Sequence, residues 1–179
     1  VCFCTDLWSD MYTSMICETN RRISVATLPG SVFHTGQTKS TAASLAERYG
    51  LRAPVEYTAN SGGKNTRTLV IRYIQSLLGN SDAGITSRIA DDVNQLHNAS
   101  LVIDDIQDGS LRRRGVECAY IKYGAPISIN AGYLECFSLL RAINMRYPAA
   151  IRTQINEIFH RYFELLHIGQ GLDIKWTSD

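Results

Sequence analysis

The sequence predicts an all-α fold, and three observations support this prediction. Apolar residues recur three or four positions apart along extended stretches, which is the period of an α-helix with one buried face. Glycine, proline and asparagine divide these stretches into segments of helical length. We find no convincing alternation of apolar and polar residues, so we expect no strand. A chain of 179 residues is long enough to bury one core.

The first expected helix covers residues 42–49, with Ser40 or Thr41 as its N-terminal cap and a glycine at its end. We expect residues 51–62 to be irregular, because they contain a proline and lead into a glycine pair. A second helix should span about residues 65–78, where an apolar stripe is followed by a Gly-Asn stop signal.

Three longer helices are expected in the rest of the chain. One begins near residues 81–84 and carries a group of acidic residues to its end at Gly109. Another covers residues 127–146, and Pro126 suits its first turn because that turn does not need the missing N–H. The last runs from about Ala149 to Trp176, with an apolar face along most of its length.

The composition argues against several classes of function. The formal net charge is +1, so no overall field would draw the chain to nucleic acid or to an anionic membrane. No apolar run approaches the roughly 18 residues of a transmembrane segment. The five cysteines are odd in number and form no CxxC pair, which favours reduced thiols in a cytoplasmic protein. The start, VCFCTDLW, is no signal peptide, and the missing initiator Met indicates a fragment or a processed chain.

An acidic cluster followed by a basic one is the main candidate for chemistry, in the stretch HNASLVIDDIQDGSLRRRG at residues 97–115. On a helix, Asp104 and Asp108 lie one turn apart on one face, with Asp105 beside them. Such carboxylates need a cation between them, and hard oxygen ligands suit Mg²⁺, which usually shares its shell with substrate phosphates. The arginines at 112–114 then offer planar donors to phosphate oxygens.

A solvated helix end is the alternative, and it is the commoner role of an isolated DDxxD. We expect that role for the pair Asp91 and Asp92 upstream. His97 lies two turns before Asp104 on the same face, and this context together with the arginines favours a binding site. Taken alone, His97 would be interpreted as a core histidine.

Three motifs in the same order resemble those of the trans-isoprenyl diphosphate synthases, particularly the geranylgeranyl diphosphate synthases. HNASLVIDDIQDGSLRRRG resembles the family's first aspartate-rich region, SGGKNTR (61–67) its GGKxxR motif, and ELLHIGQGLDIKW (164–176) its GQxxD region. The resemblance covers about residues 53–179. It implies an isoprenoid-synthase-type helical bundle, with residues 51–179 as the N-terminal portion of the synthase domain. Residues 1–50 are then an unassigned N-terminal segment or linker.

The resemblance implies a Mg²⁺-dependent prenyltransferase that joins isopentenyl diphosphate to an allylic diphosphate such as dimethylallyl, geranyl or farnesyl diphosphate. Asp104 and Asp108 would bind Mg²⁺, and Arg113 would help to hold the allylic diphosphate. Gln170 and Asp173, three residues apart, would face these acids across a cavity. The residues that would hold isopentenyl diphosphate are Lys64, Arg67, His97 and Arg114. Arg112 occupies a variable family position and receives no role.

Two further expectations concern the product and the assembly. Ala99 and Ser100 lie one turn before Asp104, where large aromatic residues close the pocket in short-product members of the family. Because both are small here, the resemblance favours the twenty-carbon product, geranylgeranyl diphosphate. Family members usually form dimers, so we expect a homodimer, with the apolar helix at 127–146 as the candidate contact.

Other interpretations stay open at this point. A class I terpene cyclase shares the DDxxD motif and its Mg²⁺, but it would not need GGKNTR or the arginine cluster. A cyclase domain before this one would make the chain part of a bifunctional terpene cyclase–prenyltransferase. The family's second aspartate-rich motif is missing, so we expect the domain to be incomplete at its C-terminus. A truncated, non-catalytic or regulatory subunit is therefore a further interpretation.

Overall fold

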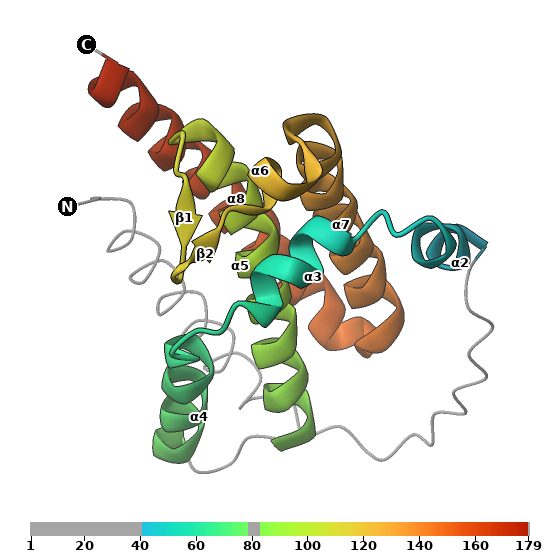
Figure 1. The fold of residues 1–179 in the computed structure, drawn as a ribbon. Helices are drawn as coiled ribbons and strands as arrows, with labels where there is room; N and C mark the ends of the chain where they lie inside the picture. Colours follow the sequence, from blue (N-terminus) through green and yellow to red (C-terminus); the bar gives the residue numbers. More distant parts are fainter. Residues whose placement is uncertain (1–40, 79–82, 179) are drawn as a thin grey trace. The chain divides into compact units, whose positions relative to one another are not determined.

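The computed structural model describes residues 41–78 and 83–178, and the chain is almost wholly helical there (Figure 1). The helices in this part of the chain are α2 (Thr41–Arg48), α3 (Ala53–Asn60), α4 (Thr66–Leu78), α5 (Ala83–Gln107), α6 (Ala119–Tyr123), α7 (Ala125–Arg146) and α8 (Ala149–Ser178). The all-α prediction is confirmed for these residues. Our expectations for residues 1–40 lie outside the described part of the chain.

The prediction that residues 51–62 are irregular is wrong, because α3 occupies most of this stretch. Pro54 lies in the first turn of α3, where a missing N–H costs no hydrogen bond and the fixed φ angle suits the helix. The helix ends at Ser61, whose N–H donates to the carbonyl groups of Tyr57 and Thr58. The proline therefore starts a helix here, although its presence in a short segment suggested a loop.

The prediction of no strand is wrong for one short antiparallel hairpin, formed by β1 (Arg112–Arg113) and β2 (Val116–Glu117). Arg114 and Gly115 form the turn, with φ angles of 54° and 86°. Positive φ at both central residues matches the twist of the flanking strands, which is why such turns join hairpins. Two-residue strands are too short for an alternating pattern to reveal them, since that signal needs four or more residues.

The chain divides into two compact units. Among the described residues, the first unit contains 64–78, 83–97 and 137–178, and the second contains 41–63 and 98–136. Helices α5 and α7 each contribute one part to each unit.

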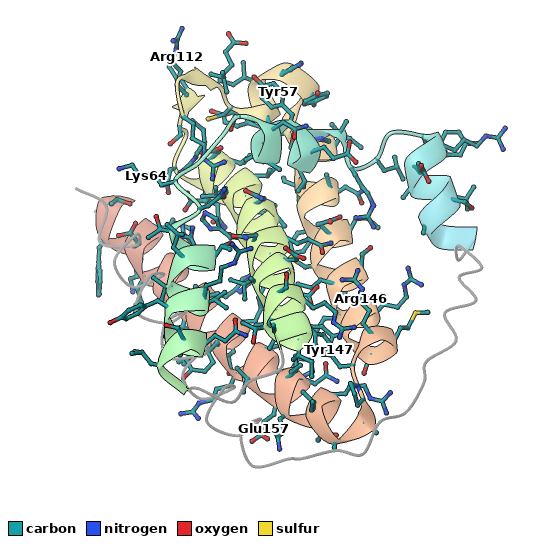
Figure 2. All side chains as sticks on the ribbon, turned by 90° about the horizontal axis from the view of Figure 1, so that it is seen from below. Tyr57, Lys64, Arg112, Arg146, Tyr147 and Glu157 are labelled. Carbon is teal, nitrogen blue, oxygen red and sulfur yellow. The ribbon has the colours of Figure 1, made fainter. Side chains whose placement is uncertain are left out.

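The core of the first unit contains a carboxylate that the sequence analysis placed in solvent. Only Asp91 is exposed, whereas Asp92 has 6% of its surface exposed. Asp92 Oδ2 accepts a hydrogen bond from the Tyr147 hydroxyl at 2.7 Å, and its Oδ1 accepts one from Arg146 Nη1 at 2.9 Å. Arg146 and Tyr147 extend from the C-terminal end of α7 (Figure 2). The prediction of a solvated pair is therefore wrong for Asp92, which joins α5 to α7.

The core of the second unit is built from small and branched side chains. Five buried residues form one cluster: Val55, Ala99, Val102, Ala119 and Ala131. Helix α7 approaches α5 closely at Gly132, where a Cβ atom would lie 2.8 Å from Ile103 Cδ1 and 3.3 Å from the Ala99 carbonyl oxygen. This contact fixes the last turns of α5, which lead directly to the acidic cluster.

Candidate functional site

The β1–β2 hairpin lies beside the C-terminal end of α5 within the second unit (Figure 1), and there Arg113 contacts the acidic cluster. The Asp108 N–H donates to the Asp104 carbonyl at 2.8 Å, so one helical hydrogen bond continues beyond the last residue of α5. Gly109 then adopts a φ of 62°, and the Ser110 N–H donates to the Asp105 carbonyl at 2.9 Å. This is the Schellman arrangement, in which a left-handed glycine closes the helix. It turns the chain back toward the β1–β2 hairpin.

Arg113 bridges two carboxylates at this helix end. Its Nε donates to Asp105 Oδ1 at 2.7 Å, and its Nη2 donates to Asp104 Oδ2 at 2.7 Å. The same Nη2 lies 2.6 Å from Asp105 Oδ1. Burial alone would lower the pKa of Arg113, but its hydrogen bonds to Asp105 and Asp104 raise it. These are short, charge-assisted bonds, which are the stronger class of hydrogen bond in proteins.

The two carboxylates differ in burial. The Asp105 side chain has 1% of its surface exposed, whereas that of Asp104 has 18%. Burial and the nearby charge of Asp108 raise the pKa of Asp104 to about 6, against the opposing effect of Arg113. The Asp104 carboxylate is therefore less acidic than an exposed one, first because it is buried and second because Asp108 lies near it.

Arg114 extends to a different part of the second unit. Its Nη1 donates to the Thr58 carbonyl at 3.3 Å, and its guanidinium group lies over Gly63, where a Cβ atom would be 3.2 Å from Arg114 Cζ. Burial and the neighbouring Arg113 lower the pKa of Arg114. Arg112, by contrast, is exposed at the edge of the hairpin (Figure 2). Three consecutive arginines therefore have three different environments.

The remaining predicted binding residues lie in the first unit. Lys64 is exposed just before α4, and Arg67 lies in the first turn of that helix, as expected. His97 is partly buried in α5, seven residues before Asp104. Gln170 is buried and Asp173 is partly buried, on α8. The structure thus brings Asp104 and Asp105 together with Arg113 in the second unit. The binding roles of Lys64, Arg67, His97, Gln170 and Asp173 stay predictions.

Ala99 and Ser100 both lie on α5, one turn before Asp104, as predicted. Ala99 has no exposed surface and belongs to the core cluster of the second unit, whereas Ser100 is partly buried. Their role in setting product length stays a prediction.

At the end of α5, the predicted ligands Asp104 and Asp108 could offer oxygen atoms to a magnesium ion only as an open site, and this metal site stays a prediction. Within the described ranges, no group of three or more His, Cys, Asp or Glu side chains is arranged to hold a metal ion. In such an open site, the two carboxylates would supply two oxygen ligands, and water and phosphate would complete the shell. Mg²⁺ commonly binds in this way, through one or two carboxylates together with substrate phosphates.

Sequence reasoning missed two contributors to this site. Asp105 was placed beside the predicted metal ligands without a role, yet it makes the closest contacts with Arg113. Gly63 was assigned only to a motif, yet it leaves space for the Arg114 guanidinium group. The adjacent DD and GG pairs were the available signals in the sequence. They do not show which aspartate is buried against Arg113 or which glycine lies under Arg114.

Comparison with known proteins agrees with the motifs. The family model of polyprenyl synthetases matches residues 49–179. The chain is 38% identical to the geranylgeranyl pyrophosphate synthase of Eremothecium gossypii over 131 residues, covering 72% of this chain and 41% of that protein. It is 41% identical to the geranylgeranyl pyrophosphate synthase of Rhodocybe pseudopiperita over 126 residues, covering 65% and 34%.

A third relative is described as a bifunctional sesterterpene synthase, astC of Talaromyces wortmannii. It is 35% identical over 128 residues, covering 71% of this chain and 16% of that protein. The chain thus spans less than half the length of these curated relatives. No helix in the described ranges has both the length and the apolar character needed to cross a membrane.

Proposed function

This chain belongs to the polyprenyl synthetase family, and from that premise we propose that it condenses isopentenyl diphosphate with an allylic diphosphate. The observation that carries the proposal is the meeting of Asp104, Asp108 and Arg113 at one helix end. Carboxylates that a cation can join, beside an arginine that can donate to phosphate oxygens, form a site for a metal-bound diphosphate.

Asp104 and Asp108 would hold Mg²⁺, which acts as a Lewis acid on the leaving diphosphate when bound. Arg113 would donate to the phosphate oxygens of the allylic substrate and offset the charge that develops as its C–O bond breaks. The alkene of isopentenyl diphosphate then attacks the allylic carbon as the diphosphate leaves, and the resulting carbocation passes a proton to the released diphosphate to give the product. The chain contributes positioning and charge neutralisation to this reaction.

Isopentenyl diphosphate would bind near the start of α4. Lys64 lies just before this helix and Arg67 lies in its first turn, and the N-terminus of a helix favours an anion. The family resemblance also assigns His97 and Arg114 to isopentenyl diphosphate, and it assigns Gln170 and Asp173 to the side of the cavity that faces Asp104 and Asp108. Small residues at 99 and 100 favour geranylgeranyl diphosphate as the product, in keeping with the names of the first two relatives.

A homodimer is the proposed assembly, and the surface of α7 supports it. Ile129, Tyr133 and Phe137 follow one another at four-residue spacing along one face of α7, and 38%, 50% and 67% of their surfaces are exposed. Large exposed apolar residues on one helix face are typical of an interface. Sedimentation of the purified protein as a monomer at micromolar concentration would contradict this assembly.

The function is tested by incubating the purified protein with Mg²⁺, farnesyl diphosphate and labelled isopentenyl diphosphate. We expect labelled geranylgeranyl diphosphate, and removal of Mg²⁺ with a chelator should abolish its formation. A labelled cyclic hydrocarbon would instead indicate a bifunctional protein, the second candidate, which the description of the Talaromyces wortmannii relative favours. Absence of any transfer would contradict both and leave the regulatory-subunit interpretation.

A further inference from the structure

Arg113 binds the same carboxylate that the proposed function assigns to the metal. Its Nη2 lies 2.7 Å from Asp104 Oδ2, so a guanidinium group already provides the positive charge next to this oxygen. A guanidinium group and Mg²⁺ repel each other, and each would compete for the lone pairs of Asp104. Binding of a metal ion to Asp104 should therefore displace this one contact of Arg113.

Asp105 is placed differently and would keep its contact with Arg113. Its carboxylate is almost completely buried, and both Nε and Nη2 of Arg113 approach its Oδ1. The buried Cys118 thiol lies next to it, and burial together with the charge of Asp105 raises the pKa of this thiol to about 11. A carboxylate in these surroundings is poorly placed to meet a metal ion that enters from solvent, but it is well placed to hold an arginine.

We propose that Asp105 is a positioning residue that anchors Arg113, while the Arg113–Asp104 contact is exchanged for a metal ion when the metal-bound diphosphate enters. In the metal-free protein, the Arg113 guanidinium group therefore occupies the place next to Asp104 that the metal ion would take. After the exchange, Asp105 still holds Nε and Nη2 through its Oδ1, and the Nη2 hydrogen that pointed at Asp104 can be donated to a phosphate oxygen. This inference rests on the proposed function for the identity of the metal and the diphosphate.

The exchange predicts that Arg113→Gln binds metal ions more tightly than the wild type when no diphosphate is present. Titration with Mn²⁺, followed by electron paramagnetic resonance, measures this directly and does not depend on turnover. Loss of a partly buried charge-assisted contact corresponds to roughly tenfold in affinity. Arg112→Gln is the matched control, because it removes an exposed charge from the adjacent position and should change the affinity by less than about twofold.

An affinity of Arg113→Gln equal to or weaker than that of the wild type would overturn the exchange. An equal gain in Arg112→Gln would also overturn it, because the effect would then come from net charge alone.

The positioning role predicts non-additive losses in diphosphate binding. In saturating Mn²⁺, Asp105→Asn and Arg113→Gln should each weaken the binding of inorganic pyrophosphate by roughly tenfold. The double variant should be no weaker than Arg113→Gln alone, because Asp105 acts through Arg113. Losses that add in the double variant would overturn the role of Asp105. Should Asp105→Asn fail to fold, the Mn²⁺ titration of Arg113→Gln still decides the exchange.

Failure of this inference is distinguishable from failure of the proposed function. Prenyl transfer by the wild type combined with an unchanged metal affinity in Arg113→Gln would contradict the exchange alone. Tighter metal binding by Arg113→Gln without any prenyl transfer by the wild type would contradict the function alone.

Discussion

Replacing Tyr147 with phenylalanine should destabilise the protein more than replacing Arg146 with alanine, although both side chains bind the carboxylate of Asp92. Tyr147 has 4% of its surface exposed, whereas the Arg146 side chain has 47% exposed. Loss of the tyrosine hydroxyl leaves one oxygen of a buried carboxylate without this donor, which costs about 1.5–3 kcal/mol. Because Arg146 is about half exposed, water can replace it as the partner of Asp92 Oδ1, and we expect its contact to contribute only about 0–1 kcal/mol.

The loss of stability caused by Tyr147→Phe should also depend on pH. Burial raises the pKa of Asp92 above the ordinary value of an aspartate, although the hydrogen bond from Tyr147 and the charge of Arg146 lower it. Because the folded-state pKa is the higher one, protonation favours the folded chain, and stability is lost as pH rises between the two values. Tyr147→Phe removes a bond that lowers this pKa and so enlarges that loss. The deficit of the variant should therefore be larger at neutral pH than at mildly acidic pH.

Urea titrations and thermal melts followed by circular dichroism, at neutral and mildly acidic pH, measure both effects. At neutral pH the melting temperature of Tyr147→Phe should fall by roughly 3–12 °C, given about 2–4 °C per kcal/mol for a chain of this size. An equal or larger cost of Arg146→Ala would refute the reasoning from burial. A deficit of Tyr147→Phe that grows on acidification would refute the assigned sign of the pKa shift.

Three further predictions concern the second unit and the proposed site. Gly132→Ala should destabilise the protein by about 1 kcal/mol in a urea titration, because overpacking against Ile103 outweighs the gain in helix propensity. Gly171→Ala is the control and should be stabilising, because a Cβ atom there meets nothing within 4 Å. Asp104→Ala should abolish the strengthening of pyrophosphate binding by Mg²⁺ in calorimetric titrations, and equal affinities of the wild type with and without Mg²⁺ would contradict the metal site. Ser100→Phe should shift the product from twenty to fifteen carbons in a chromatographic assay, unless the wild type itself stops at farnesyl diphosphate, which would place the floor of the pocket elsewhere.

The helices and the motifs could be predicted from the sequence because both are local properties. Each of the long helices α5, α7 and α8 shows its apolar period within a short window, and observed and predicted bounds agree within a few residues. The DDxxD and GGKxxR patterns identify the family for the same reason, since their residues are close together in the chain. The same local reasoning failed at α3, because a proline signals either a loop or a helix start depending on where the first turn falls.

Burial of charged groups was decided only by tertiary structure. Asp91 and Asp92 are indistinguishable in sequence, yet Asp92 is buried because Tyr147, 55 residues away, donates to it. Likewise Asp105 turns inward beside Asp104, because a hairpin closed by Arg114 and Gly115 returns Arg113 to the end of α5. A carboxylate enters a protein interior only where a partner satisfies its hydrogen bonds, and that partner is set by how distant segments pack.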